Sequence, residues 1–175
     1  MKTKSEKNEW IEWLRTIIIA GIIAMIIKSF LFEPFEVRGS SMYPTLANKD
    51  RLVINKIEYL IHEPDYGDII VFKYPADLSL SFIKRIVAKD GDTVEIKNNV
   101  VYINDKEVVE PYIPSNKIEN FPKTKVPNNS YFVLGDNRNN SRDSRYRDVG
   151  FLTKENIIGK AIVKIWPLKA MKIIE

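Results

Sequence analysis

Residues 81–92, SFIKRIVAKDGD, carry the strongest signal for the fold. Val, Ile and Phe dominate the first eight positions, as is typical of β-strands, and an Asp-Gly-Asp turn signal follows. Two cations, Lys84 and Arg85, interrupt this apolar run. Because side chains alternate across a strand, the two cations must point to opposite faces of a sheet, and one of them should face the core unless the strand lies at an edge.

Similar strand-like runs occur on both sides of this stretch and predict a mainly β, antiparallel fold. They are RLVINKI (51–57), GDIIVFKY (67–74), DTVEIK (92–97), VVYIN (100–104), SYFVLGD (130–136) and IIGKAIVKIW (157–166). Turn residues such as Asn98-Asn99 and Asn104-Asp105 favour hairpins between neighbouring strands. Four prolines between Glu110 and Pro127 oppose a continuous strand, so about 94–130 is expected to be a loop or a small inserted β subdomain.

The composition excludes several kinds of site. The chain of 175 residues has 27 Lys and Arg against 23 Asp and Glu, and this small excess is spread along the sequence, which argues against a nucleic-acid partner. There is no cysteine, which excludes disulfides, thiolate metal sites and cysteine nucleophiles. With His62 as the one histidine, no metal or other cofactor is expected, and hydrolytic chemistry must use Ser, Thr, Asp, Glu or Lys.

An apolar run near the start predicts a membrane anchor over residues 16–32. The uncharged core TIIIAGIIAMII (16–27) is short enough for a signal peptide, but aromatic residues flank it, and a helix from Trp10 to Phe32 would reach roughly 34 Å, enough to cross a bilayer. No Ala-x-Ala cleavage site follows the run, so we expect an uncleaved transmembrane helix. The alternative, a buried core helix, fits poorly because the run is apolar on all sides.

The distribution of cations predicts the orientation of this anchor. Lysines and one arginine are concentrated in residues 1–15, whereas the fifteen residues after Phe32 contain only Arg38. The N-terminus is therefore expected in the cytoplasm, with residues 33–175 on the other side of the cell membrane as the one extracytoplasmic domain of a single-pass protein.

The stretch RGSSMYPTL (38–46) places Ser40 and Ser41 just beyond the anchor. Paired serines near Gly and Pro often form an ordinary turn, but they can also hold a hydroxyl at a fixed height above a membrane. A lysine buried beside such a hydroxyl would lose hydration of its charged form and could accept the serine proton, which arginine cannot do. Lys84 is therefore the candidate base, with an exposed Lys-Arg pair as the alternative.

A second polar motif, GDNRNNSRDSR (135–145), follows an apolar strand. Its charges alternate in sign at Asp136, Arg138, Asp143 and Arg145, and such residues can form paired hydrogen bonds that support a site. A solvated charge cluster is the alternative. A Ser-His-Asp arrangement through His62 is a weaker hypothesis, because His62 lies in a turn-rich linker.

Together these motifs resemble the type I signal peptidases, membrane-anchored Ser/Lys endopeptidases. The anchor is followed in the family's order by GSSMYPTL, YGDIIVFKYP, IKRIVAKDGD and GDNRNNSRDSR. The resemblance implies Ser41 as nucleophile and Lys84 as general base. It also implies a supporting set, in which Ser141 orients the lysine, Asp143 and Arg145 form an ion pair, and Asp136 and Arg138 are structural.

One position departs from the Gram-negative pattern: Gly39 stands where a serine can contribute a hydroxyl to the oxyanion hole. A glycine here is more similar to the Gram-positive members. The resemblance implies cleavage of signal peptides from exported preproteins after small residues (Ala-x-Ala), at the bilayer and beside the protein translocase. The alternatives are a more specialised Ser/Lys protease and a noncatalytic, membrane-anchored β binding module.

Overall fold

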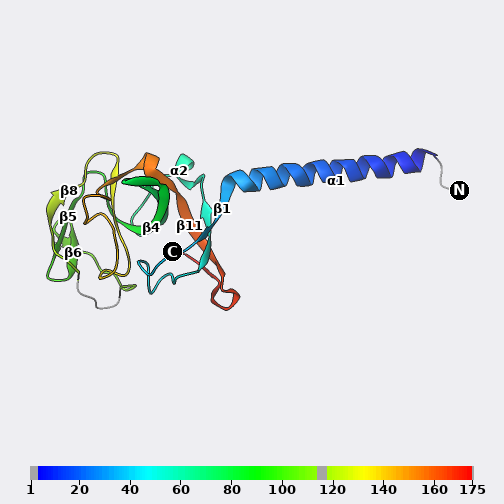
Figure 1. Ribbon diagram of the computed structural model, residues 1–175. Helices are drawn as coiled ribbons and strands as arrows, with labels where there is room; N and C mark the ends of the chain where they lie inside the picture. Colours follow the sequence, from blue (N-terminus) through cyan, green and yellow to red (C-terminus); the bar gives the residue numbers. More distant parts are fainter. Residues whose placement is uncertain (1–3, 114–117, 175) are drawn as a thin grey trace.

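The computed structural model describes residues 4–113 and 118–174, in which one long helix projects from a β-rich body (Figure 1). The helix is α1 (Lys4–Leu31). The strands of the body are β1 (Phe32–Glu36), β2 (Arg51–Asn55), β3 (Ile69–Tyr74), β4 (Asp77–Lys89), β5 (Thr93–Lys97), β6 (Val100–Ile103), β7 (Lys106–Glu107), β8 (Phe121–Lys125), β9 (Ser130–Leu134), β10 (Leu152–Thr153), β11 (Ile157–Trp166) and β12 (Lys172–Ile173). Short helical turns are α2 (Glu58–Ile61), η1 (Lys154–Asn156) and η2 (Leu168–Ala170).

The strands form two sheets, and every pair within them is antiparallel, as predicted. The larger sheet has the order β1-β2-β11-β3-β4-β9-β10, with β12 added beside β11. The smaller sheet has the order β7-β6-β5-β8. The central place of β4 in the larger sheet follows from its long apolar run, which is buried on both faces near its C-terminal end.

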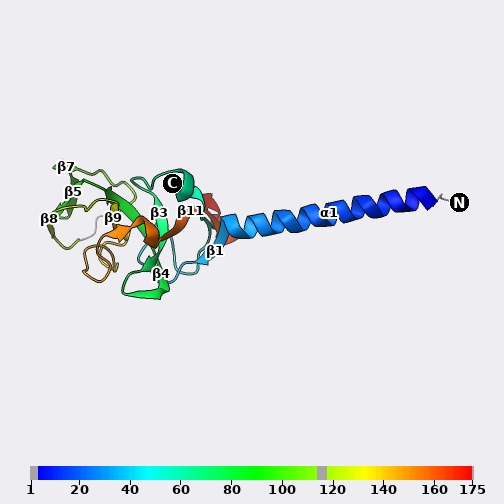
Figure 2. The same cartoon turned by 90° about the horizontal axis from the view of Figure 1, so that it is seen from above.

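The smaller sheet lies at the end of the body away from α1 (Figure 2). Its hairpins turn at Asn98-Asn99 and Asn104-Asp105, and all four residues have positive φ, which confirms the predicted turns. Apolar side chains of β5 and β6, including Val94 and Val101, pack in one cluster with Phe132 of β9. The two sheets therefore share a core.

Five strands, β1, β7, β8, β10 and β12, were not predicted from the sequence. β1, FEPFE, pairs only with β2, and β8, FPKTK, pairs only with β5. Both contain a proline, which is tolerated because each strand lies at the edge of its sheet. The prolines between Glu110 and Pro127 were expected to oppose a continuous strand, yet residues 121–125 form β8, where edge pairing accommodates Pro122.

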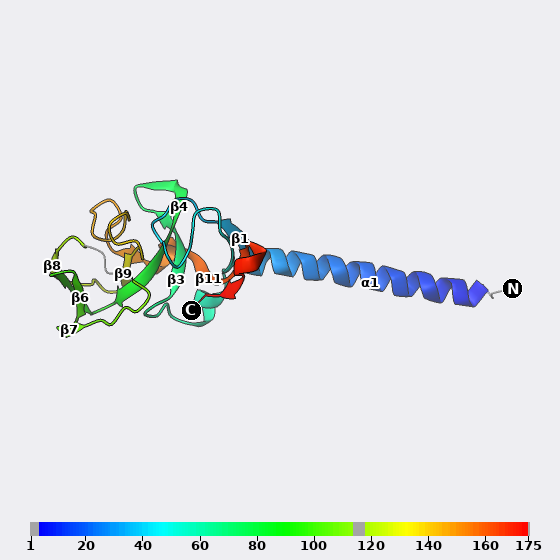
Figure 3. The same ribbon diagram turned by 90° about the horizontal axis from the view of Figure 1, so that it is seen from below.

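Helix α1 covers most of the range predicted as an anchor, and β1 begins directly at its end (Figure 3). In the part of the chain that the structure describes, no helix combines the length and apolarity needed to cross a membrane. The anchor over residues 16–32 stays a prediction.

Gly159 of β11 permits close packing against β2, and it provides a test of this architecture. A Cβ added there would lie 2.4 Å from the Asn55 carbonyl oxygen, a contact that only a backbone shift can relieve. We expect Gly159→Ala to lower the free energy of unfolding by about 1–3 kcal/mol, measured by urea denaturation. An unchanged unfolding midpoint would contradict the close approach of β11 and β2.

Candidate active site

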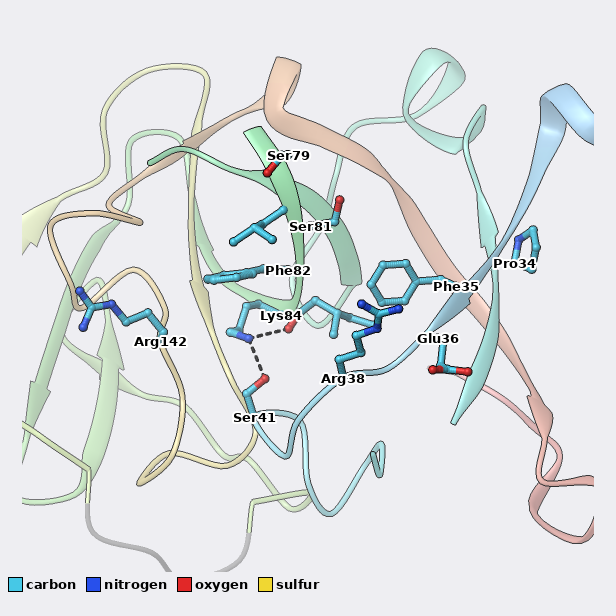
Figure 4. Close-up of a pocket in the computed structure, with 12 residues that line it drawn as sticks. Pro34, Phe35, Glu36, Arg38, Ser41, Ser79, Ser81, Phe82, Lys84 and Arg142 are labelled. Carbon is cyan, nitrogen blue, oxygen red and sulfur yellow. Dashed lines mark hydrogen bonds between the residues drawn. The ribbon is translucent and has the colours of Figure 1, made fainter. Parts of the chain in front are cut away.

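Ser41 lies in the turn that follows β1. Met42 and Leu46, both fully buried, anchor the turn in the core. At its start Gly39 has a φ of +90°, which favours glycine, and its N–H donates to Asn48 Oδ1 at 2.9 Å. The Ser41 hydroxyl is thus carried on a packed turn and faces the groove between β1 and β4 (Figure 4).

The Lys84 ammonium lies against this hydroxyl. Lys84 Nζ is 2.7 Å from Ser41 Oγ and also donates to the Ile83 carbonyl oxygen at 2.8 Å (Figure 4). The lysine comes from β4, and only 3% of it is exposed. Serine and lysine, 43 positions apart in the chain, therefore form a close pair in which the lysine is buried and the serine half-buried.

Burial of Lys84 changes its acid–base behaviour. Loss of hydration disfavours the charged amine and lowers the pKa of Lys84 from 10.5 to about 8. The negative charges of Asp143 and Asp136 act in the opposite direction and offset part of this decrease. A substantial fraction of the amine is therefore neutral near pH 8 and can accept a proton from the hydroxyl beside it.

Arg85 is buried as well, on the opposite face of β4. Its guanidinium donates to both carboxylate oxygens of Asp136 at 3.0 and 2.8 Å, and the Thr45 hydroxyl donates to the same carboxylate at 2.6 Å. One of the two cations was expected to face the core, and both are in fact buried. Both faces of β4 are covered at this point, and the paired carboxylate makes burial of the arginine possible.

Asp143 and Arg145 form a second buried ion pair. Arg145 Nε and Nη2 lie 2.8 and 2.9 Å from the Asp143 carboxylate oxygens. The same carboxylate accepts the backbone N–H of Gly135 at 3.0 Å. The pair thereby fixes both ends of the 135–145 loop to one another.

Ser141 is brought to the site but without the bond that the family resemblance implies. Its Oγ is buried and has no hydrogen-bond partner among the described residues, Lys84 included. Gly135 packs between it and the serine turn, since a Cβ at Gly135 would lie 2.1 Å from Ser141 Oγ and 2.5 Å from the Ser41 carbonyl oxygen. The loop and the turn are therefore in direct contact.

Asn137 makes two of the hydrogen bonds between the loop and the serine turn. Its backbone N–H donates to the Ser41 carbonyl oxygen at 2.9 Å, and its side-chain amide donates to the Ser40 carbonyl oxygen at 3.1 Å. Asn140 adds a bond to Ser40 Oγ at 3.0 Å. Sequence analysis did not single out Asn137, because asparagine in a polar loop signals a turn and says nothing about a distant partner.

Of the two remaining candidate residues, Arg138 is buried and His62 is exposed. Arg138 pairs with Glu110, a residue that sequence analysis did not single out. His62 follows α2, and its Nδ1 lies 3.3 Å from Glu58 Oε1. The structure thus brings Ser41 together with Lys84 and places His62 in a separate surface contact.

A groove of about 510 Å³ runs past the Ser41–Lys84 pair. Residues of β1, including Phe35, line one side, and residues of β4 around Phe82 line the other (Figure 4). Within the described residues, β1 has a strand partner on one edge only and β4 pairs with β9 only from Arg85 onward, so each of these groove-lining strands has an edge without a strand partner. Such edges suit an extended peptide.

Comparison with known proteins identifies consistent similarities. The sequence model of the family described as "Signal peptidase, peptidase S26" matches residues 10–166. "Signal peptidase I S" of Bacillus subtilis (strain 168) is 41% identical over 179 residues, covering 96% of this chain and 95% of the relative. "Probable signal peptidase I-2" of Synechocystis sp. is 40% identical over 173 residues, covering 95% and 78%.

A solved structure agrees with these matches. The crystal structure of a signal peptidase I from Enterococcus faecalis V583 is 32% identical, with a TM-score of 0.50, and covers 57% of this chain and 97% of that one. The resemblance inferred from the sequence motifs is confirmed.

Burial of Lys84 predicts that the wild type and the variant Lys84→Met differ in stability by an amount that depends on pH. Methionine keeps the approximate length of the side chain and removes its charge. Below about pH 8 the lysine is charged in both states and its burial destabilises the fold. Between about pH 8 and 10.5 Lys84 is protonated in the unfolded state and largely neutral in the folded state. The free energy of unfolding of the wild type therefore rises with pH over this range. We expect Lys84→Met to be more stable by about 2–3 kcal/mol at pH 7.

Urea denaturation of both proteins in detergent at pH 7 and at pH 10 tests this expectation. The advantage of Lys84→Met should shrink at the higher pH. A difference that stays constant between the two values would show that the folded and unfolded proteins titrate Lys84 alike.

Proposed function

The chain belongs to the signal peptidase family, peptidase S26, and from this membership we propose that it removes N-terminal signal peptides from exported preproteins with Ser41 as nucleophile and Lys84 as general base. It is a serine endopeptidase by family. The observation that carries the assignment of the two residues is the 2.7 Å approach of the buried Lys84 Nζ to Ser41 Oγ.

The proposed reaction is acyl transfer. Neutral Lys84 accepts the hydroxyl proton while Ser41 Oγ attacks the scissile carbonyl carbon, and the protonated lysine then gives that proton to the leaving amine. This step breaks the peptide bond and leaves an ester on Ser41. A water molecule that transfers a proton to the same lysine hydrolyses the ester and regenerates the hydroxyl. No metal or other cofactor enters the scheme.

The tetrahedral intermediate needs hydrogen-bond donors for its oxyanion. The Ser41 backbone N–H is the proposed donor, because Gly39 offers no side-chain hydroxyl. The carbonyl oxygens of Ser40 and Ser41 accept bonds from Asn137, which fixes the peptide planes on both sides of the nucleophile. The donor is therefore held in one orientation before substrate arrives.

The supporting residues are proposed to position the catalytic dyad, the pair formed by Ser41 and Lys84. Asp136 and Asp143, each paired with an arginine, fix the loop that contacts the serine turn. Ser141 lies at this contact, and its unpartnered hydroxyl is proposed to bond Lys84 once the amine moves toward the leaving group.

The substrate is proposed to bind as an extended strand in the groove. Main-chain bonds to β1 and β4 would give affinity for any sequence, whereas the side chains that line the groove would select small residues on alternate positions, as in Ala-x-Ala. Phe35, Phe82 and Ile83 supply apolar walls near the dyad. Preproteins are thus the proposed partners.

Residues 16–32 are proposed to anchor the enzyme in the cell membrane. Support comes from the uncharged run over 16–27 and from the concentration of cations in residues 1–15. In this arrangement 1–15 are cytoplasmic and 33–175 form an extracytoplasmic catalytic domain, with about 94–130 as its inserted subdomain. β1 follows α1 directly and lines the groove, so the site would lie near the bilayer and beside the translocase.

The dyad predicts the behaviour of two point variants. Detergent-solubilised wild type should cut a preprotein with an Ala-x-Ala site after the small residue, whereas Ser41→Ala and Lys84→Ala should lose at least about 1,000-fold in rate. Circular dichroism should confirm that all three fold. Equal behaviour of the three proteins would refute the assignment and favour a binding module.

The titration of Lys84 predicts a pH–rate profile. Since only the neutral amine can accept the proton, kcat/KM should rise about tenfold per pH unit below pH 8 and level off above it. The measurement is peptide hydrolysis between pH 6 and pH 10. A profile that is flat across pH 8 would contradict lysine as the base.

A further inference from the structure

Glu110 lies in the segment that connects β7 with β8 and reaches back toward the site from the smaller sheet. Its carboxylate accepts two hydrogen bonds from the Arg138 guanidinium, with Nη1 and Nη2 at 2.8 and 2.6 Å. The side chains are only 10% and 3% exposed. This is a desolvated, two-point ion pair between the 135–145 loop and a segment 28 residues earlier in the chain.

Arg138 transmits this contact to the serine turn. Its third nitrogen, Nε, donates to the Gly135 carbonyl oxygen at 3.1 Å. Its chain neighbour is Asn137, which bonds the carbonyl oxygens of Ser40 and Ser41. Arg138 and Asn137 therefore connect Glu110 to the serine turn.

Tyr112 extends the same contact to the arginine on β4. Its hydroxyl donates to Glu110 Oε1 at 3.0 Å, and its ring lies 4.0 Å from the guanidinium carbon of Arg85. Arg85 in turn holds Asp136, the residue after Gly135. The segment 110–112 thus supports the loop through two arginines.

The location of Glu110 separates it from substrate. Glu110 and Tyr112 line a different cavity of about 470 Å³, together with Ile86 and Val87 of β4, and none of these residues lines the groove that contains Ser41. A change at Glu110 can therefore reach the reaction only indirectly, through Arg138 and the loop or through Tyr112 and Arg85. Buried ion pairs also give little net stability, so such a pair is better explained by the geometry it enforces.

We propose that Glu110 is a positioning residue for the peptidase reaction, holding the 135–140 loop through Arg138 so that the Ser40–Ser41 turn keeps Ser41 against Lys84. This inference rests on the proposed function for its kinetic consequence. It gives the smaller sheet a part in catalysis without contact with substrate.

The test compares Glu110→Gln with Glu107→Gln in the full-length protein in detergent. Gln keeps the size of the side chain but loses the charge and one accepting oxygen, whereas Glu107 is exposed on β7 and serves as the matched control. Two readouts are used: kcat and KM for a preprotein with an Ala-x-Ala site, and amide hydrogen exchange of residues 135–141.

We expect Glu110→Gln to lower kcat about tenfold or more while KM stays within about twofold, because misplacement affects the reacting atoms and not the groove. Exchange in 135–141 should become faster. Glu107→Gln should match the wild type in both readouts. Unchanged kcat, an increase confined to KM, or unchanged exchange in 135–141 would each overturn the inference.

A paired variant covers the case in which Glu110→Gln fails to fold. Glu110→Met with Arg138→Met removes both charges and leaves no unpaired ion in the interior. We expect this protein to fold and to keep the low kcat, whereas wild-type kcat would overturn the positioning role. If the wild type itself cuts no preprotein, the proposed function fails, and exchange in 135–141 still decides whether Glu110 holds the loop.

Discussion

The contact between a buried lysine and a serine hydroxyl is the constraint on which the structure of this protein depends. An amine that must be neutral near pH 8 needs an environment from which water is largely excluded, and Lys84 gains this environment from the middle of a long strand covered on both faces. Burial alone would lower the pKa further. The charges of Asp143 and Asp136 offset part of the effect. The burial of Lys84 is thus both a feature of the fold and a requirement of the proposed chemistry.

Keeping two carboxylates near this lysine imposes a second requirement. Each buried carboxylate needs a cation that never loses its proton, and each has an arginine: Arg85 for Asp136 and Arg145 for Asp143. Because every bond is directional, the loop that carries the carboxylates has little freedom. The serine turn, which bonds to that loop, is ordered by the same set of interactions.

Local patterns explain why part of this could be predicted. Strands such as β3 and β4 and the Asn-Asn and Asn-Asp hairpins follow from composition and turn chemistry, and the family resemblance assigned Ser41 and Lys84. The strand β1 did not follow, since Pro34 argues against a strand unless an edge position is known. Glu110 and Asn137 could not be found either, because their partners lie 28 and 96 or more positions away, and no spacing rule relates them.

The burial of both cations on β4 has a consequence for the arrangement of the two sheets. Arg85 emerges on the face opposite Lys84, so part of the support for the loop comes from that face, where Tyr112 contacts its guanidinium. The groove occupies the other side, between β1 and β4. The groove proposed to bind substrate and the contacts that hold Arg85 therefore lie on opposite faces of β4. The side that contacts substrate can remain open, while on the other side Asp136 and Tyr112 hold Arg85 in place.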